Sequence, residues 1–316
     1  MGNQNNTMEY AQQVLAQVRK AIVGKDEVLM WVLAAILAGG HILMEDIPGV
    51  GKTTMALAFS RALGLQQNRM QFTPDVLPTD VTGYSVLDQA TGKMTYQKGA
   101  VLCNLFLADE LNRATSRTQS ALLEAMEEGQ VTVDGVSRPL PQPFVVIATQ
   151  NPVGAAGTQL LPDSQLDRFM VRLSLGYPDP KDEMAMVKSR QGGNPLTEVM
   201  PVLSDRELTA LQQAVAETHI SDDMTAYVVE LIQATRAHED LLRGASPRAT
   251  LAVVSMAKAV ARLRGRDYVV PRDVQEVLHI TLAHRLHLSH SAHAQGLTAQ
   301  DVLQKLLGSV RAPKLH

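Results

Sequence analysis

The chain has 316 residues, a length that suits about two domains of ordinary size. Hydrophobic residues make up 45% and charged residues 19%, a globular balance that argues against a disordered chain. The formal net charge of -3 provides no bulk attraction for nucleic acids or other polyanions, although it is compatible with a local basic patch.

The single cysteine, Cys103, excludes an intrachain disulfide and fits a reducing compartment, and we expect it to be a small core residue rather than a nucleophile. The first ten residues have neither the basic flank nor the apolar run of a secretory signal. The longest apolar stretch, residues 28–44, is interrupted by Gly39, Gly40 and His41 and is too short to cross a bilayer. The sequence therefore predicts a cytoplasmic protein without a transmembrane segment.

The first half of the chain alternates short apolar runs with helical patterns. Apolar runs predict buried strands at residues 41–44, 104–110, 143–151 and 169–175, and helical patterns between them include residues 53–64. Uninterrupted apolar strands separated by helices indicate an α/β domain, in which a parallel sheet has helices on both faces.

Two segments with alternating polarity, near residues 83–99 and 129–141, predict hairpins that the sheet does not need. The first turns at Thr91–Gly92, and the second at Asp134–Gly135, which is the stronger hairpin signal. We therefore treat both hairpins as inserts in the α/β domain.

Proline and glycine punctuate the chain after Tyr177, so we place the boundary of the N-terminal unit at residues 1–178 and a linker at residues 179–203. The N-terminal unit comprises an N-terminal helix and the α/β core. Residues 204–316 have helical periodicity in almost every segment, which predicts an all-α C-terminal domain. Helix starts are marked by four N-cap candidates and two first-turn prolines: Ser204, Ser221, Ser246, Thr298, Pro247 and Pro271.

The segment EDIPGVGKTT, residues 45–54, matches a Walker A phosphate-binding loop except that Asp46 occupies the position of the first glycine. Backbone N–H groups and the lysine hold the phosphates in such loops, so Asp46 weakens the pattern without removing the mechanism. The alternative is an ordinary strand–turn–helix with a solvated lysine. Because a strand precedes the segment and a helix follows it, we predict a nucleotide site at Pro48, Gly49, Val50, Gly51, Lys52, Thr53 and Thr54.

Two carboxylates, Asp109 and Glu110, end the predicted strand at residues 104–110. Ligands of open parallel sheets bind at this edge. Asp109 could hold Mg²⁺ together with Thr53, and Glu110 could orient or deprotonate an attacking water. An isolated acid pair is commonly a solvated helix start, but beside a phosphate loop it predicts an ATPase.

The order of several blocks resembles the MoxR family of AAA+ ATPases, from Ile22 to the end of the chain. The blocks are IVGKDE, EDIPGVGKT, FTPDVLPTDVTG, LADELNRA, ATQNP, QLDRF, GASPRA and RGRDYVVPRDV. The resemblance implies an AAA+ core followed by a helical lid, with ATP and Mg²⁺ as cofactors and ATP hydrolysis as the reaction. It also implies that the two hairpins are the helix-2 and pre-sensor-1 inserts of this clade.

The resemblance assigns roles to residues that their local sequence alone would leave as turn or surface residues. Asn151 resembles sensor 1, which orients water near the γ-phosphate, and Arg168 resembles the arginine finger given to the neighbouring subunit. Arg248 resembles sensor 2, and its place at a helix N-terminus suits anion contact. The adenine would be wrapped by the segment that contains Ile22, Val23 and Gly24.

The resemblance also implies a homo-oligomeric ring, expected to be a hexamer, that remodels client protein complexes as a chaperone does, with von Willebrand factor A-type proteins as partners. Three alternatives remain: a magnesium-chelatase-like subunit, a nucleic-acid motor of the same clade, and an ATP-gated binding scaffold. The inserts carry only Lys93, Lys98 and Arg138 as basic residues, so no specific nucleic acid partner is expected. Glu110 argues against a pure scaffold, because binding alone does not need a water-activating acid.

Four histidines recur every third residue near the C-terminus, at a spacing close to that of helical metal ligands: His284, His287, His290 and His293. Their segment contains serine and glycine, and no nearby acid or cysteine completes a metal site. We expect a solvated tail rather than a metal centre.

Overall fold

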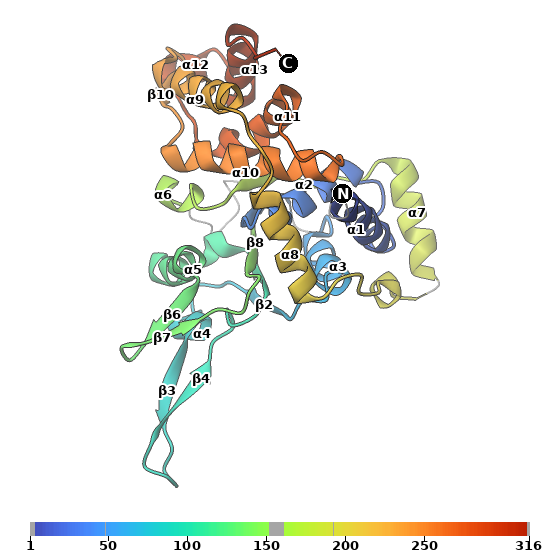
Figure 1. Cartoon of the computed structure of the whole chain (residues 1–316). Coiled ribbons are helices and arrows are strands. Elements are labelled where there is room, and N and C mark those ends of the chain that lie inside the picture. Colours follow the sequence, from blue (N-terminus) through green and yellow to red (C-terminus); the bar gives the residue numbers. More distant parts are fainter. Residues whose placement is uncertain (1–3, 48, 152–160, 192, 315–316) are drawn as a thin grey trace.

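The computed structural model of the chain describes residues 4–47, 49–151, 161–191 and 193–314 (Figure 1). Its centre is a five-stranded sheet in the order β2-β5-β8-β1-β9, in which every neighbouring pair is parallel. The strands are β1 Ile42–Glu45, β2 Gln67–Gln71, β5 Leu105–Asp109, β8 Val145–Gln150 and β9 Val171–Leu173. The four predicted strands are confirmed, and β2 is an additional edge strand that the sequence analysis missed.

Alternate side chains of the sheet enter two separate hydrophobic cores. Leu43, Phe106 and Val146 belong to the core under α4 Pro78–Thr82 and α5 Ser116–Glu128. Their neighbours Ile42, Leu107 and Ile147 belong to the core on the opposite face. That core includes α1 Gln4–Val18, α2 Asp26–Leu37 and α3 Lys52–Ala62. The sheet is therefore covered by helices on both faces, as predicted.

The last third of the chain is a helical lid that shares a core with the sheet. Its helices are α8 Asp205–Ala216, α9 Asp222–Ala237, α10 Pro247–Leu263, α11 Pro271–Leu282, α12 His290–Ala294 and α13 Ala299–Ser309. Helix α10 packs against α1 and α2 as well as against its lid neighbours, and it lies across the top of the α/β domain in Figure 1. The predicted caps Ser204, Ser221, Ser246 and Thr298 all accept hydrogen bonds from the first turns of their helices.

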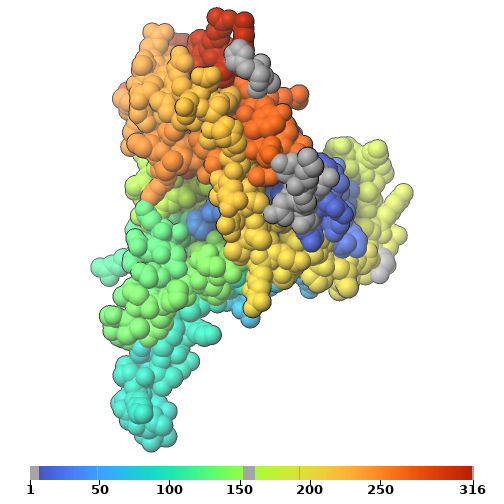
Figure 2. Space-filling model, in the orientation of Figure 1, coloured from blue at the N-terminus to red at the C-terminus, as the bar shows by residue number. Residues whose placement is uncertain are grey.

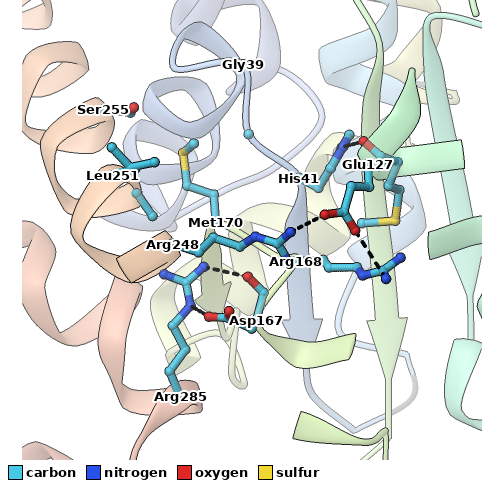
Figure 3. Close-up of a pocket in the computed structure, with 13 residues that line it drawn as sticks. Gly39, His41, Glu127, Asp167, Arg168, Met170, Arg248, Leu251, Ser255 and Arg285 are labelled. Atoms are coloured by element: carbon cyan, nitrogen blue, oxygen red, sulfur yellow. Dashed lines mark hydrogen bonds and ion pairs between the residues drawn. The ribbon is translucent and has the colours of Figure 1, made fainter. Parts of the chain in front are cut away.

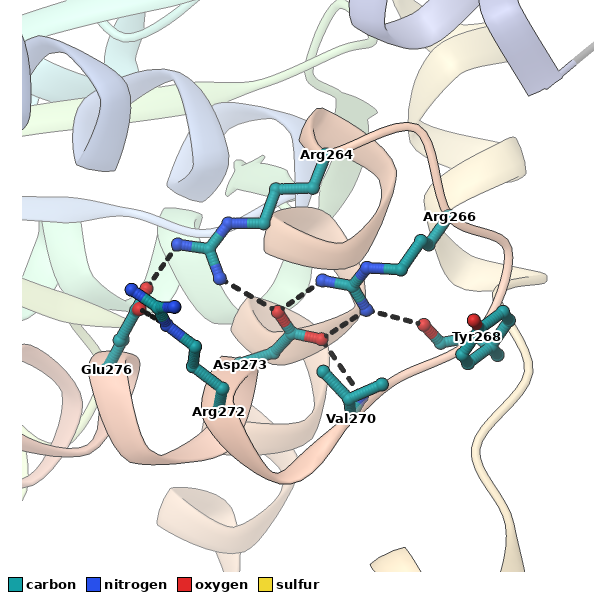
Figure 4. A network of polar contacts seen from close by, with 7 residues as sticks. All are labelled: Arg264, Arg266, Tyr268, Val270, Arg272, Asp273 and Glu276. Carbon is teal, nitrogen blue, oxygen red and sulfur yellow. Dashed lines mark hydrogen bonds and ion pairs between the residues drawn. The ribbon is translucent and has the colours of Figure 1, made fainter. Parts of the chain in front are cut away.

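A buried ion-pair network joins two lid helices (Figure 4). Asp273, which is fully buried in the first turn of α11, accepts from Arg264 at the end of α10 (3.1 Å) and from both terminal nitrogens of Arg266 (2.6 and 2.7 Å). It also accepts from the main-chain N–H of Val270. A buried carboxylate is stable only when it is paired. These contacts therefore explain the block RGRDYVVPRDV, whose side chains connect the end of α10 to the start of α11.

The two inserts form antiparallel hairpins at the end of the molecule opposite the lid (Figures 1 and 2). Strands β3 Gly83–Leu87 and β4 Met94–Lys98 make the longer hairpin, and β6 Gln130–Val133 and β7 Val136–Pro139 make the shorter one. The guanidinium of Arg138 lies over the ring of Tyr96, 3.9 Å from its centroid, and so links the two hairpins. The predicted hairpins are thus confirmed, and they contact one another.

The segments around the lid contain two features that the sequence did not reveal. The segment expected to be a linker, residues 179–203, contains α7 Pro180–Gln191 and a 3₁₀ turn, η2 Pro195–Glu198. The lid is helical, as predicted, and it also carries one short strand pair, in which β10 Leu241–Arg243 pairs with β11 His287–Leu288. Helix α7 has no buried residue, so the apolar periodicity that reveals a packed helix is missing from its sequence.

The histidine segment is folded rather than a solvated tail. His284 lies in the 3₁₀ turn η3 Ala283–Arg285 and is buried, with Nε2 donating to the carbonyl oxygen of Phe169 (3.1 Å). His287 belongs to β11, and His290 and His293 belong to α12. Within the described ranges, no group of three or more His, Cys, Asp or Glu side chains is placed to hold a metal ion.

Two further expectations concern burial. Cys103 is a core residue, and burial raises the pKa of its thiol to about 12, which makes it a poor nucleophile at neutral pH. Of the helices in the part of the chain that the structure describes, none is both long enough and apolar enough to cross a bilayer.

Candidate nucleotide site

The phosphate-binding loop connects the C-terminal end of β1 to the first turn of α3. Gly51 caps α3 with a φ of 103°, a left-handed conformation that a residue with a side chain rarely adopts. Lys52 follows it, and its ammonium donates to the carbonyl oxygens of Asp46 (2.7 Å) and Ile47 (3.3 Å). Burial lowers the pKa of Lys52, while the carboxylates of Asp46, Asp109 and Glu110 oppose that shift. Pro48, the predicted entry residue, lies outside the described residues.

Asp46, which replaces the expected first glycine, fixes the start of the loop. Its buried carboxylate accepts hydrogen bonds from the Ser174 hydroxyl (2.7 Å) and from the main-chain N–H groups of Leu175 (2.7 Å) and Gly176 (2.9 Å). These residues follow β9, so the carboxylate ties the loop to the next strand of the sheet. The departure from the Walker pattern thus has a structural role that the motif did not reveal.

The two acids at the end of β5 are oriented by one hydroxyl. Thr149, on the neighbouring strand β8, donates to Oδ1 of Asp109 (2.7 Å) and accepts from the main-chain N–H of Glu110 (2.8 Å). Thr53 Oγ1 lies 3.5 Å from Oδ2 of Asp109. A hydroxyl and a carboxylate side by side are suitable oxygen ligands for Mg²⁺, so the residues present fit the predicted metal. Thr149 was not selected from the sequence, although it belongs to the block ATQNP.

Glu110 is held by two side chains near its carboxylate. Asn151 donates from its amide to Oε1 (3.3 Å), and Arg113 donates to Oε2 (3.0 Å). Glu110 itself has a left-handed backbone, with a φ of 55°, a conformation that is costly for a residue with a side chain. Asn112 fixes the main chain of Asn151 through hydrogen bonds to both its N–H and its carbonyl. The predicted sensor residue and the predicted water-activating residue are therefore in direct contact.

One cavity brings most of the predicted nucleotide residues together: Gly49, Gly51, Lys52, Thr53, Thr54, Asp109, Glu110 and Asn151. Arg69, Gln71 and Arg190 also line it and were not predicted. Arg69, on the missed strand β2, pairs with Oδ2 of Asp109 at 2.8 Å. Arg190 belongs to α7, the helix inside the segment that was expected to be a linker.

The predicted adenine segment borders this cavity without lining it. Ile22 is buried, and its Cδ1 would lie 3.9 Å from a Cβ atom placed on Gly51. Gly24 lies directly against the carboxylate of Asp182 on α7. Val23 is half-buried, and Val50 packs against the core under the same loop. The adenine role of these residues stays a prediction.

Arg168 and Arg248 lie in a different cavity, at the other end of β1 (Figure 3). That cavity is lined by Gly39, Gly40 and His41, which precede β1, whereas the phosphate loop follows β1. A strand rises about 3.3 Å per residue, so the length of β1 separates the two cavities by roughly 13 Å. Among the residues that the structure describes, none lines both cavities. The arginines therefore do not meet the phosphate loop of their own chain.

The two arginines converge on one carboxylate. Arg168, which precedes β9, pairs with Oε2 of Glu127 at 3.1 Å, and Arg248, in the first turn of α10, pairs with Oε1. In Figure 3 both guanidinium groups point toward Glu127, one from the α/β domain and one from the lid. Glu127, near the end of α5, was not singled out in the sequence analysis.

A second carboxylate fixes the main chain of both arginine segments. Asp167 accepts from the hydroxyl of Ser246, the N-cap of α10 (3.0 Å), and pairs with Nε of the buried Arg285 (3.1 Å). Arg285 also donates to the carbonyl oxygens of Asp167 (3.0 Å) and Phe169 (2.8 Å). Burial lowers the pKa of Arg285 to about 10, which leaves it charged at neutral pH. The histidine segment, from which Arg285 comes, thus anchors Arg168.

The parallel sheet, the phosphate loop and the helical lid define a P-loop nucleotide-binding protein of the AAA class. The sequence model of the ATPase family associated with various cellular activities (AAA) matches residues 41–171, and that of the AAA lid domain matches residues 233–306.

Individual relatives extend the match over the whole chain. The chain is 42% identical over 301 residues to YeaC, an uncharacterized Bacillus subtilis protein, with 95% of this chain and 94% of YeaC covered. It is 38% identical over 314 residues to the chaperone MoxR1 of Mycobacterium tuberculosis, with 96% of this chain and 83% of MoxR1 covered. The crystal structure of a candidate ATPase from Cytophaga hutchinsonii matches with a TM-score of 0.91 at 36% identity, covering 98% of this chain and 97% of that one. The chain belongs to the MoxR family of AAA+ ATPases.

Proposed function

We propose that this protein binds ATP with Mg²⁺ and hydrolyses it to ADP and phosphate at sites shared between the subunits of a ring. The observation that carries the proposal is the separation of two half-sites. Lys52, Asp109 and Glu110 meet in one cavity, whereas Arg168 and Arg248 meet at the other end of β1. A complete site then combines the loop half of one subunit with the arginine half of its neighbour.

The chemistry follows from the positions of the side chains in the loop half. Lys52 and the loop N–H groups bind the β- and γ-phosphates, and Thr53 and Asp109 would hold Mg²⁺, which would supply positive charge beside the phosphates. Glu110 accepts a proton from the attacking water, and Asn151, 3.3 Å from its carboxylate, orients that water. The neighbour's Arg168 and Arg248 stabilise charge that develops on the transferred phosphoryl group, an effect of about 10³–10⁵ in rate for an arginine finger.

The hairpins are proposed to contact the client. Three apolar side chains near the tip of the longer hairpin are exposed, Val86, Leu87 (56%) and Met94 (63%), on a protrusion outside both cores. Exposed apolar groups clustered in this way are typical of protein-binding surfaces. We further propose a hexamer that remodels client complexes, with von Willebrand factor A-type proteins as partners. The similarity to the chaperone MoxR1 supports the remodelling role.

The hairpins favour a protein client over nucleic acid. Of their three basic residues, Arg138 is engaged by the ring of Tyr96 and by two main-chain carbonyls, at Val133 and Val136. Single-strand binding needs a basic groove with aromatic stacking faces, and Lys93 and Lys98 alone do not provide it. The pairing of Glu110 with Asn151 favours hydrolysis over an ATP-gated scaffold.

The dependence of the ATPase rate on protein concentration tests this proposal. Phosphate release and the binding of a fluorescent ATP analogue are measured over the same dilution series, with sedimentation velocity to follow assembly. Binding is expected already in the dilute subunit, because the loop half is complete in one chain, whereas the rate per subunit rises with assembly. A rate per subunit that stays constant through the change from monomer to ring would contradict the shared site.

A further inference from the structure

The Glu127 carboxylate bridges two arginines that come from different domains. Its Oε2 pairs with the guanidinium of Arg168, and its Oε1 pairs with that of Arg248. These are charge-assisted pairs, and arginines make contacts of the same kind with phosphate oxygens. A carboxylate between two guanidinium groups therefore occupies the position that an incoming phosphate needs.

Local structure does not explain an acid at this position. Glu127 lies in the last turn of α5, where the main-chain carbonyls make the potential negative, and no basic residue of α5 compensates there. The adjacent Glu128 is in the same last turn and is exposed. The favourable contacts of Glu127 thus come from the two arginines rather than from its own helix.

The three side chains are free to exchange partners, whereas their main chains are fixed. Arg168, Arg248 and Glu127 keep 29%, 42% and 37% of their side-chain surface exposed. Ion pairs with this exposure are weak, so a polyphosphate can displace them. Nε of Arg168 is in addition buried without a hydrogen-bond partner among the described residues, which leaves a donor unused in the present arrangement.

The anchors on the two sides of the cavity are held by hydrogen bonds and by an ion pair. Beside Glu127, His41 donates from Nε2 to the carbonyl oxygen of Met126 (3.2 Å) and accepts at Nδ1 from the N–H of Val146 (3.1 Å), which ties the end of α5 to β8. Beside Arg168, the side chain of Arg285 is only 3% exposed. Exchange of the counterion therefore requires rotation of side chains and no shift of the backbone.

We propose that Glu127 is the resting counterion of Arg168 and Arg248, and that the phosphates of a neighbouring subunit's nucleotide replace it on assembly. This inference rests on the proposed function, in which both arginines serve the neighbour. In an isolated subunit the single negative charge of Glu127 offsets part of the two adjacent positive charges. In the ring, the phosphates of the nucleotide bind both guanidinium groups instead. Because they have to displace Glu127, this residue sets the nucleotide and protein concentrations at which a shared site forms.

Tripolyphosphate binding to full-length variants tests the counterion directly. The Lys52→Ala change removes the chain's own phosphate site, so calorimetry then reports the arginine cavity. Added Glu127→Gln is expected to tighten tripolyphosphate binding about fivefold, the factor that corresponds to loss of an exposed ion pair. The matched control, Glu128→Gln, removes the same charge one residue away and is expected to change the affinity much less. Adding Arg168→Ala to the Glu127→Gln variant should abolish this increase in tripolyphosphate affinity.

Equal affinities in the Glu127→Gln and Glu128→Gln variants, with circular dichroism showing both folded, would overturn the counterion role. Weaker binding in the Glu127→Gln variant would overturn it as well, since Glu127 would then support the site. In the otherwise wild-type chain, Glu127→Gln should lower the protein concentration for half-assembly with a non-hydrolysable ATP analogue about fivefold. Tighter tripolyphosphate binding with unchanged assembly would instead contradict the proposed sharing of sites, so the two failures are distinguishable.

Discussion

The side-chain amide of Asn151 donates to Oε1 of Glu110 across 3.3 Å. The residue proposed to orient water and the residue proposed to deprotonate it are thus joined by a direct hydrogen bond. Arg113 holds the other carboxylate oxygen, at 3.0 Å. Because Glu110 has two partners on its own chain, an attacking water would have to compete with them for its carboxylate.

Changes at Lys52 and Glu110 should separate binding from hydrolysis. Lys52→Ala is expected to lose most ATP affinity, because the ammonium reaches the β- and γ-phosphates. Glu110→Gln is expected to retain ATP affinity and lose turnover, because it alters only the group that accepts a proton. Titration of a fluorescent ATP analogue distinguishes the two variants. Equal loss of affinity in both would show that these roles are wrongly assigned.

Thr149 is expected to act as a positioning residue for both acids. Thr149→Val removes the hydroxyl that contacts Asp109 and Glu110, and we expect an ATPase rate about 10–100-fold lower, as for other groups that orient metal ligands. Thr149→Ser keeps the hydroxyl and should restore most of the rate. The Mg²⁺ concentration needed for half-maximal nucleotide binding should also rise in Thr149→Val alone. If Thr149→Ser were as impaired as Thr149→Val, the methyl group rather than the hydroxyl would be important.

The fold was predictable wherever burial left a pattern in the sequence. The strands β1, β5 and β8 are almost entirely buried, so their sequences are uninterrupted apolar runs. By contrast, β2 has the sequence QNRMQ on an exposed edge, and α7 has no buried residue. Neither segment has regularly spaced apolar residues. Strand β2 is therefore revealed only by its pairing with β5, and α7 only by the structure.

The nucleotide site likewise contains residues that their local sequence reveals and residues that it does not. Residues 49–54, Asp109 and Glu110 are adjacent in short motifs whose chemistry is local, and the sequence predicted that they meet. Glu127, Asp167 and Arg285 act through contacts between segments that are 40 or more residues apart, and nothing in their local sequence marks them. Asp46 is similar, because its three partners lie after β9.

The tip of the longer hairpin should be needed for the response to a client. The combined change Val86→Ser, Leu87→Ser and Met94→Ser leaves Gly83, Gly99 and the hydrogen bond from Tyr96 to Thr82 intact, so the hairpin should still form. We expect unchanged affinity for a fluorescent ATP analogue and loss of ATPase stimulation by a client. The polar control Gln89→Ser with Gln97→Ser should keep the stimulation. Full stimulation of the apolar variant would place the client site elsewhere, for instance on the lid.

Acid should destabilise the protein through two histidines, the half-buried His41 and the buried His284. Burial lowers the pKa of His41 to about 4 and that of His284 well below its usual value. Both are neutral when folded and become protonated near pH 6.5 when unfolded, so the unfolded chain binds more protons in between. Stability is therefore highest above pH 6.5 and falls as the pH approaches the folded pKa, by up to about 1.4 kcal/mol per pH unit for each histidine.

Urea unfolding at pH 7.0 and pH 5.0 measures this dependence. His41→Gln, which can keep one donor and one acceptor, should weaken the pH dependence, whereas the exposed control His290→Gln should not. An unchanged pH dependence in His41→Gln would mean that His41 is not responsible for the acid sensitivity.

Mixed rings test the central claim, that the arginine half of one subunit completes the loop half of its neighbour. Arg168→Ala and Lys52→Ala are each expected to be nearly inactive alone. Mixed under conditions of subunit exchange, they should regain part of the ATPase rate, because an Arg168→Ala subunit supplies an intact Lys52 while its Lys52→Ala neighbour supplies both arginines. Arg248→Ala should behave like Arg168→Ala in this mixture.

The decisive measurement is the ATPase rate of Arg168→Ala mixed with Arg248→Ala, across all ratios and with mixed rings verified. Both changes damage the same half-site, so no interface in the mixed ring contains both arginines, and we predict no recovery above the two single variants. Recovery in this mixture would show that Arg248 serves the nucleotide of its own chain. That result would contradict the arrangement in which Arg168 and Arg248 act together on the neighbour.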